Sequence, residues 1–312
     1  RAEGLPGEVA DAIRDHYKPV GQGDEVPTAP VTLAVSLADK LDSLAGFFGV
    51  GMAPTGSKDP FALRRASIGV SSITLVNGLR FRLKAALEAT WAIYSSEGVT
   101  LDQSRVDELV DFSVYRLKIQ QREQGVRHDI VDAAYEWGHI AQIDDDLVRL
   151  LARVHALQSF VGTEDGTNLL AGYKRAANIL KKEDWRGIEG EIARTGEEDP
   201  LAEVDDPDLK DVVAAKLELR REKELSYTPE AAEKALTDAL DSAEPKAEAA
   251  IAAEEFENAM AALASLRSPI DRFFEEVTVN DPDEAKRSAR LELLARFRAA
   301  VHKVADFSKI EG

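Results

Sequence analysis

The chain has 312 residues, 44% of them hydrophobic, and a formal net charge of −18 at pH 7. Its lack of cysteine excludes disulfides and thiolate metal sites and fits a reducing cytoplasm. The acidic balance excludes a protein that coats nucleic acid by bulk attraction, and no apolar run approaches the roughly 20 residues that span a bilayer. We therefore expect a soluble, cytoplasmic chain. Because it starts at Arg1 and not at Met, we also expect a fragment or a processed product of a longer protein.

The N-terminal part predicts helices separated by glycine and proline. Apolar Val9, Ala10, Ile13 and Tyr17 recur at spacings of three and four, which is typical of an amphipathic helix. After a break rich in proline and glycine, a second helix starts near Pro30. This helix is apolar almost all round, so we expect it to be buried.

A glycine-rich crossing over residues 46–56 leads to a helix with a strong start signal. Asp59 is predicted as its N-cap, with Pro60 at the first helical position, where a missing N–H has no cost. The pattern breaks at Asn77 and Gly78, a natural turn, and resumes over residues 84–94. Further helices are predicted over residues 101–124, 129–137, 144–161 and 168–182.

The C-terminal part begins with an acidic stretch. From residue 183 to residue 211 there are twelve acidic residues against three basic ones, and glycines and prolines make residues 183–207 a connector. The helical pattern returns from Leu209, with segments over 229–243, 248–266 and 270–277. A final helix is predicted to have Asp281 as its N-cap, Pro282 first and Glu284 closing a capping box. Its apolar stripe consists of Leu291, Leu294, Phe297, Val301 and Val304.

No segment shows the period-two alternation of a strand, so the predicted fold is all-α. The sequence also has no fixed-period repeat of the common helical solenoids. Positive charge is concentrated in two places, residues 58–84 and residues 286–309, each with a net charge of +5. Basic faces on an acidic body suit selective contact with RNA, while the alternative is that they are ordinary solvated helix faces.

Asp39 and Asp42 lie on the mostly apolar second helix, where an acid needs a partner. Asp39 resembles the last metal ligand of HD-type phosphohydrolases, but the upstream histidines of that site are absent, and His16 is the only histidine before it. We therefore expect buried structural aspartates and no metal site. His128 and Asp129 spell the HD dipeptide in the wrong order for that architecture, so Asp129 is predicted as the N-cap of a short helix.

The segment from Thr55 to Arg65 has the most specific pattern. Arg64 and Arg65 are predicted in the second turn of a helix whose N-terminus attracts anions, and Lys58 precedes the cap. They suit either a phosphate or ion pairs with Asp39 or Asp42 that fix the two helices together. We favour pairing for one arginine and leave the other for RNA or subunit contact. No catalytic residue is predicted.

Several runs of the sequence closely resemble the beta subunit of the bacterial tetrameric glycyl-tRNA synthetase, in its C-terminal portion. The first is ADKLDSLAGFFGVGMAPTGSKDPFALRR at residues 38–65, which contains Asp39, Asp42, Lys58, Asp59, Arg64 and Arg65 as family-signature positions. The others follow in the family's order: QGVRHDIVDA at 124–133, NLLAGYKRAANIL at 168–180, PIDRFFEEVTVN at 269–280 and ADFSK at 305–309. The resemblance covers nearly the whole chain.

The resemblance implies a division into an HD-like helical remnant at residues 1–96, a helical connector at 97–163 and a helical anticodon-binding domain, called DALR, at 164–312. Here Asp238, Ala239 and Leu240 are followed by Asp241 instead of arginine, so the likeness to DALR domains is one of fold. In the family the alpha subunit attaches glycine to tRNA-Gly with ATP and Mg²⁺. The resemblance therefore implies a catalytically inactive part of a ligase, with no cofactor of its own and with tRNA-Gly and the alpha subunit as partners.

Our leading hypothesis is that the chain binds the anticodon arm of tRNA-Gly. The candidate contacts are basic residues in the region that resembles an anticodon binder: Lys174, Arg175, Arg267, Arg272, Arg287 and Arg290. Two alternatives remain open, which are a fragment of an HD-type metal-dependent phosphohydrolase and a structural helical scaffold for the alpha subunit. We expect no contact with DNA or with a membrane.

Overall fold

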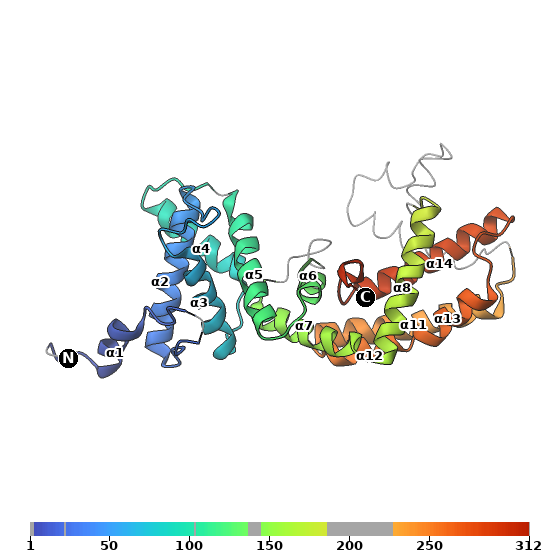
Figure 1. Ribbon diagram of the computed structural model, residues 1–312, viewed down its shortest axis with the longest axis horizontal. Helices are drawn as coiled ribbons and strands as arrows, with labels where there is room; N and C mark the ends of the chain where they lie inside the picture. Colours follow the sequence, from blue (N-terminus) through green and yellow to red (C-terminus); the bar gives the residue numbers. More distant parts are fainter. Residues whose placement is uncertain (1–2, 22, 103, 137–144, 186–226, 312) are drawn as a thin grey trace. The chain divides into compact units, whose positions relative to one another are not determined.

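The computed structural model describes residues 3–21, 23–102, 104–136, 145–185 and 227–311. Within these ranges the chain forms helices and one isolated bridge between Thr55 and Lys58, and no strand, so the predicted all-α fold is confirmed. The chain divides into unit 1, residues 1–158 with 311–312, and unit 2, residues 159–310 (Figure 1). The division into 1–96, 97–163 and 164–312 stays a prediction. Most of the predicted acidic connector lies outside the described residues.

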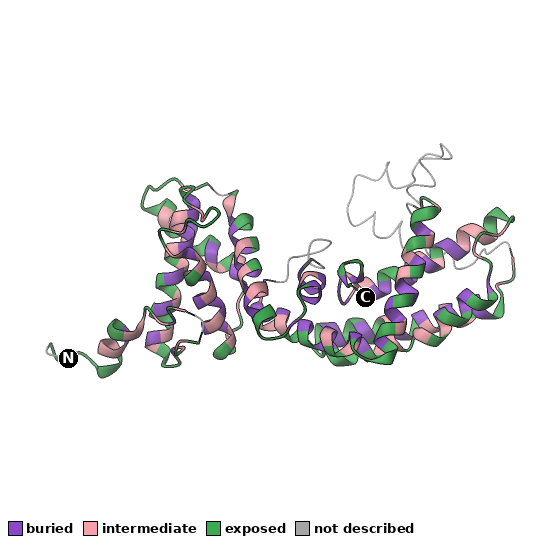
Figure 2. Cartoon of the chain, viewed as in Figure 1, coloured by how far each residue is buried: buried purple, intermediate pink, exposed green. Residues whose placement is uncertain are grey.

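Unit 1 is built from α-helices joined by short turns. They are α1 (Gly7–Asp15), α2 (Pro30–Gly49), α3 (Leu63–Val76), α4 (Leu83–Ser96), α5 (Arg105–Glu123) and α6 (His128–Glu136), followed by α7 (Leu147–Val161), which runs across the division. Helices α2, α3, α4 and α5 contact one another around one core. The core is centred on Phe48, Trp91 and Leu109, each at most 1% exposed, and Figure 2 shows the buried positions on the facing sides of these helices.

The predicted inner face of α1 is wrong, and α2 is buried along one side only and not all round. Ile13 is 68% exposed, and the buried residue of α1 is Ala12. The buried stripe of α2 contains Ser36 and Lys40 as well as Leu44. Helix α2 is apolar almost all round, so its composition did not show which side faces the core.

The start of α7 connects to α4 through two aspartates. The Asp145 carboxylate is 1% exposed and accepts hydrogen bonds from Arg82 Nε at 2.9 Å and from the backbone N–H of Lys84 at 2.6 Å. Asp146 pairs with Arg80 at 2.7 Å. Arg80 and Arg82 of the predicted basic face at residues 58–84 are therefore paired inside unit 1.

Unit 2 contains α8 (Glu164–Lys182), α11 (Ala231–Ala252), α12 (Phe256–Ala264), α13 (Arg267–Glu276), α14 (Glu284–His302) and the short 3-10 helix η2 (Phe307–Lys309). Helix α8 contacts α12, α13, α14 and η2, and α11 contacts α12, α13 and α14 (Figure 1). The predicted stripe of the final helix is confirmed, since Leu294, Phe297 and Val301 are each 0% exposed. None of the helices in the described ranges is long and apolar enough to cross a membrane.

Two helix boundaries in unit 2 differ from the prediction. Asp283, not Asp281, is the N-cap of α14, because its carboxylate accepts from the backbone N–H of Ala285 at 3.0 Å. Asp281 instead accepts from the N–H of Asp283. The alanine-rich segment continues through Pro245 as one helix, α11, and the break comes at Glu254, whose φ of 61° ends the helix.

Ion pairs join α14 to α11. Arg296 pairs with Asp241 at 2.6 Å and with Glu244 at 2.8 Å, and Lys303 pairs with Glu248. Acidic residues of α11, spaced three and four positions apart, thus form ion pairs with the bases of the final helix. Arg296 and Lys303 of the basic cluster at residues 286–309 are therefore paired within unit 2, and RNA contact by the rest of that cluster stays a prediction.

Candidate nucleic-acid interface

The best-formed basic site in unit 2 is at the C-terminal end of α8. Arg175, Ile179 and Lys182 recur at spacings of four and three, so they share one face of this helix. The face lies against the last turn of α13 and the extended chain that follows it. The guanidinium carbon of Arg175 lies 4.2 Å from the centre of the Phe274 ring, and an Arg175 N–H donates to the Phe274 carbonyl at 3.3 Å. Arg175 is exposed, whereas Phe274 is 8% exposed.

A cavity of about 230 Å³ opens beside this stacked pair. Its lining consists of Arg175, Ile179, Lys182, Glu183, Phe274, Val277, Val279 and Asn280. The floor is apolar and the rim is polar. A cavity with this division of chemistry suits a flat, partly apolar ligand with polar edges.

Arg287 lies at the edge of the same site. It comes from the first turn of α14 and pairs with Glu183, whose side chain is 17% exposed. Glu183 thus holds Arg287 beside the end of α8. Counting Arg175, Lys182 and Arg287 against Glu183, this site has a local excess of positive charge on a chain of net charge −18.

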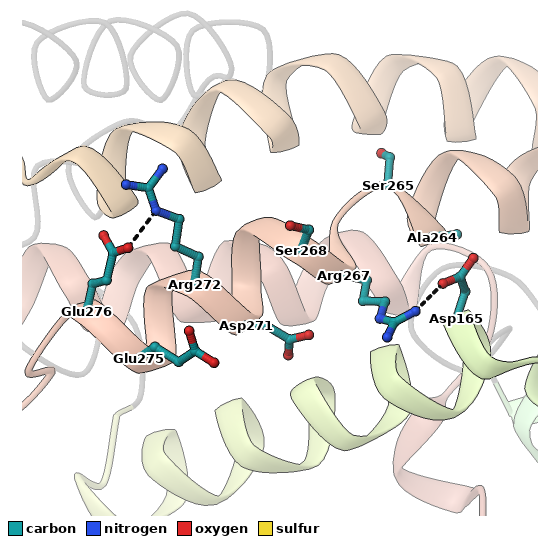
Figure 3. A pocket seen from close by; sticks show the side chains of 9 residues that line it. All are labelled: Asp165, Ala264, Ser265, Arg267, Ser268, Asp271, Arg272, Glu275 and Glu276. Atoms are coloured by element: carbon teal, nitrogen blue, oxygen red, sulfur yellow. Dashed lines mark hydrogen bonds and ion pairs between the residues drawn. The ribbon is translucent and has the colours of Figure 1, made fainter.

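A second and larger pocket is lined mainly by residues of α13. It has a volume of about 670 Å³ and its lining includes Arg267 and Arg272, which are both candidate RNA contacts (Figure 3). Arg267 pairs with Asp165 at 2.6 Å and with Glu164 at 2.9 Å, and Arg272 pairs with Glu276 at 2.8 Å.

The charge of this second pocket is unfavourable for a phosphate. Two further carboxylates, Asp271 and Glu275, lie in its lining, so acids outnumber bases there. Both arginines are already engaged, and an approaching anion meets like charge. RNA contact by Arg267 and Arg272 stays a prediction, and we leave it out of the proposal below.

Arg290 requires a correction. Its side chain is 1% exposed and makes ion pairs with Glu233 at 2.8 Å, with Asp281 at 2.9 Å and with Glu230. Burial alone would lower the pKa of Arg290, but these three carboxylates outweigh it and raise the pKa. A guanidinium enclosed in this way cannot reach a phosphate, so Arg290 is a structural residue. Lys174 is partly buried on α8, beside Arg175, and its RNA contact stays a prediction.

The acidic residues of α2 also differ from expectation. Asp39 and Asp42 are both exposed, and Asp42 interacts with the hydroxyl of Tyr94, whose pKa is raised by burial and by that carboxylate. The buried charge is that of Lys40, which is 5% exposed. Its ammonium donates to the carbonyls of His16, Tyr17 and Lys18 at 3.0 to 3.2 Å and to Ser36 Oγ. It therefore supplies hydrogen-bond donors to the carbonyl groups at the C-terminal end of α1. Burial lowers the pKa of Lys40.

The signature segment at residues 55–65 connects α2 to α3 by hydrogen bonds and packing, and not by the predicted ion pairs to Asp39 or Asp42. Asp59 is not the predicted N-cap and Pro60 is not the first helical residue, because the N-cap of α3 is Ala62 and the helix begins at Leu63. The Asp59 carboxylate still accepts from the backbone N–H groups of Leu63 at 2.8 Å and Arg64 at 3.0 Å. The Arg64 side chain donates to the Gly56 carbonyl at 2.6 Å instead of pairing with Asp39 or Asp42.

The remaining signature residues of this segment either pack on α2 or are exposed. Phe61 stacks on Phe47 of α2 at 3.8 Å between ring centres, and this contact connects the segment to α2. Lys58 and Arg65 are exposed, and among the described residues no ion pair is found for either. Contact of Lys58 or Arg65 with RNA or with another subunit stays a prediction.

The HD dipeptide has a structural role in unit 1. Asp129 lies inside the first turn of α6 and is 4% exposed, so it is not the predicted N-cap. It accepts from Arg127 and from the backbone N–H of Glu311 at 2.8 Å. Burial opposes the charged form, but these bonds outweigh it and lower the pKa of Asp129. In the ranges described above, no three His, Cys, Asp or Glu side chains are grouped so that they could hold a metal ion.

Sequence reasoning missed Phe274, Lys182, Glu183 and Asn280. A usable signal was the Phe273–Phe274 pair, because adjacent residues on a helix point about 100° apart, so only one of the two can point at the centre of the core. Phe273 is 0% exposed and fills the core, which leaves Phe274 to the edge where Arg175 covers it. The pairing of α8 with α13 could not be read from the sequence.

Comparisons with known proteins agree with this organisation. The family model described as glycyl-tRNA synthetase beta subunit matches residues 1–136, and the model of the DALR anticodon binding domain matches residues 169–311. The chain is 45% identical over its whole length to the glycine–tRNA ligase beta subunit of Rhodospirillum centenum, and 44% identical over 99% of its length to that of Paracoccus denitrificans.

In both cases the chain spans only 39% of the relative, which is its C-terminal part. The beta subunit of Phenylobacterium zucineum is 44% identical over the whole chain, again with 39% of the relative covered. One family model matches most of unit 1 and the other most of unit 2, in the order that the resemblance predicted. The chain therefore belongs to the glycyl-tRNA synthetase beta-subunit family.

Proposed function

We propose that the chain is a tRNA-binding, non-catalytic portion of glycyl-tRNA synthetase, and that unit 2 holds the anticodon arm of tRNA-Gly. The alpha subunit would then attach glycine with ATP and Mg²⁺, in the cytoplasm, and no cofactor would bind to this chain. One observation carries the proposal: exposed Arg175 and Lys182 and paired Arg287 gather at one cavity, inside the region that matches the DALR anticodon binding domain.

The charge distribution supports a selective contact. A net charge of −18 opposes non-specific attraction to nucleic acid, so affinity has to come from a local cluster. Phosphate contacts by lysine and arginine position RNA, while unpaired bases supply specificity through stacking and edge hydrogen bonds. The cluster at the end of α8 contains both kinds of group, since charged side chains surround an apolar floor.

The test is a fluorescence anisotropy titration of the chain with labelled tRNA-Gly and with a non-cognate tRNA, at low and moderate salt. We expect tighter binding of tRNA-Gly. Lys182→Ala should weaken binding and reduce the salt slope by about one, because one phosphate contact is lost. Lys234→Ala is the matched control, since Lys234 is a 71%-exposed lysine paired with Asp238 on α11. Equal affinity for both tRNAs, unchanged by Lys182→Ala, would contradict the proposal.

A second candidate function, a helical scaffold for the alpha subunit, is favoured by a different observation. Large apolar side chains are exposed on and around α1 and at the start of α2, and they include Ile13 at 68%, Tyr17 at 50% and Val35 at 42%. Exposed apolar groups that gather in one part of a chain indicate a protein contact. If this holds, an Ile13→Ser, Tyr17→Ser variant loses co-purification with the alpha subunit and keeps its affinity for tRNA. Retained co-purification would remove this candidate.

A further inference from the structure

We propose that the cavity at the end of α8 takes one unpaired RNA base, which stacks on the Arg175 guanidinium while the opposite face of that group rests on Phe274. This inference rests on the proposed function of unit 2 and adds to it a binding site, its stacking group and the class of its ligand. It makes Arg175 a stacking residue, which is a different role from a general phosphate contact.

The geometry of Arg175 carries the stacking step. Its guanidinium carbon lies over the Phe274 ring at 4.2 Å, and one of its N–H groups donates to the Phe274 carbonyl at 3.3 Å, so two contacts hold the group against α13. Because the ring covers one face, the other face is the one left to a ligand. Bases stack on arginine planes as well as on aromatic rings. A guanidinium that is already held in place loses little conformational freedom when the base arrives.

The size and lining of the cavity favour a single base. Its volume of about 230 Å³ is below the usual range for drug-sized ligands, about 300–1,000 Å³. The apolar side chains of Ile179, Val277 and Val279 form a floor for a ring. A base inside a duplex cannot enter such a cavity, so the site selects an unpaired nucleotide.

The rim offers groups for the edge of the base and for its phosphate. The Asn280 amide lies in the lining, and an amide of this kind can both donate to and accept from the edge of a base. The Glu183 carboxylate, held by Arg287, can accept from an amino group. Lys182 is exposed at the mouth, where a phosphate attached to the bound nucleotide would lie.

The experiment is a double-mutant cycle between the protein and the RNA. The full 312-residue chain is titrated with an anticodon-arm hairpin of tRNA-Gly and with a series in which each loop nucleotide in turn is abasic. With the unaltered chain, one abasic position should weaken binding about 10- to 100-fold, the usual effect of losing one stacked base. With Arg175→Ala, the intact hairpin should already show that loss, and the same abasic change should cost nothing more.

Two further variants separate stacking from charge. Arg175→Lys keeps the positive charge but has no plane, so it should behave like Arg175→Ala at that position. Lys181→Ala removes one exposed charge from the same end of α8, outside the cavity, and should keep the full abasic penalty. Arg175 and Lys181 are exposed, so none of these substitutions should leave a cavity in the core.

The outcomes distinguish a failure of the proposed tRNA-binding function from a failure of the base site alone. If the unaltered chain does not bind the intact hairpin, the proposed function and the base site both fall. If it binds, but every abasic change has the same effect in the unaltered chain and in Arg175→Ala, only the base site is overturned. If Arg175→Lys retains the abasic penalty, Arg175 acts by charge and the stacking assignment is wrong.

Discussion

The Arg290 Nε atom donates to Glu233 at 2.8 Å, and both side chains are almost completely buried, at 1% and 4% exposure. Glu233 also accepts from the Tyr227 hydroxyl at 2.8 Å and from the backbone N–H of Glu230, so it joins the start of α11 to the middle of α14. A buried charge pair of this kind is costly to break from one side, because the remaining charge has neither water nor a partner.

Arg290→Ala should lower the free energy of unfolding by about 3–5 kcal/mol, since it leaves Glu233 and Glu230 without their cation. Urea denaturation followed by circular dichroism measures this change. Arg272→Ala is the matched control, because its pair with Glu276 is about half exposed and screened by solvent, so its loss should have a much smaller effect. Similar losses for both variants would contradict a structural role that is special to Arg290.

Gly69→Ala should destabilise unit 1 by about 1–2 kcal/mol, although alanine normally favours a helix. A Cβ at this position would lie 2.6 Å from Lys40 Cε, and Lys40 is held by its hydrogen bonds to the end of α1.

The effect of Gly69→Ala should change sign when Lys40 is removed. In a Lys40→Ala background the space is open, and the substitution should stabilise by about 0.5–1 kcal/mol. Gly7→Ala, which meets no atom within 4 Å, is the control. Unfolding curves of the four combinations test this, and additive effects would show that Lys40 does not set the fit.

Stability should decrease in mildly acid solution because of His302. Burial lowers its pKa from the ordinary value of 6.5, Arg298 adds to this, and Asp306, whose carboxylate is 3.7 Å from Nε2, opposes it. The Tyr173 hydroxyl, 2.6 Å from Nε2, stays protonated because burial and Asp306 raise its pKa to about 12.

The sign of the effect follows from these pKa values. The folded state binds the proton less readily than the unfolded state, so the contribution of His302 is present above the unfolded pKa and is lost as the pH falls through the lower folded pKa. Melting temperatures between about pH 8 and about pH 5 should therefore decrease more for the unaltered chain than for His302→Asn, which does not titrate. Identical profiles would show that His302 is not responsible.

Asp59→Ala should cost about 0.5–2 kcal/mol, because the N–H groups of Leu63 and Arg64 lose their acceptor at the start of α3. Asp59→Asn keeps one side-chain oxygen and should cost less. Ser57→Ala, an exposed position two residues earlier, is expected to have no effect. Denaturation midpoints provide the measurement, and a midpoint for Asp59→Ala equal to that of Ser57→Ala would refute the capping role.

Helix existence was predictable where an apolar stripe was sharp. Leu294, Phe297 and Val301 of α14 were predicted as core and are buried, because period and packing agree there. The faces of α1 and α2 were not predictable, since Ile13 is exposed and Lys40 is buried. The buried position of Lys40 depends on carbonyls of the chain that directly follows α1, and no local pattern records them.

The residues of the candidate site were likewise only partly predictable from the sequence. Arg175 and Arg287 were identified from their charge and from the resemblance of their region to an anticodon binder, whereas Arg290 has the same residue type and the same helix as Arg287 but lies in the core. What differs is the partner: Arg287 meets Glu183 near the surface, and Arg290 meets Glu233 inside. Charge is a property of one residue, while access to RNA depends on what covers it.

The sequence by itself determined the all-α class, the family and the order of its parts, because helical periodicity and signature runs are local in the chain. Tertiary structure alone decided which charges are free, since residues far apart such as Arg175 and Phe274, or Glu233 and Arg290, meet only after α8, α11, α13 and α14 have packed. Burial and pairing set the energy of a charged group. For this reason the fold could be predicted from periodicity, and the binding surface could not.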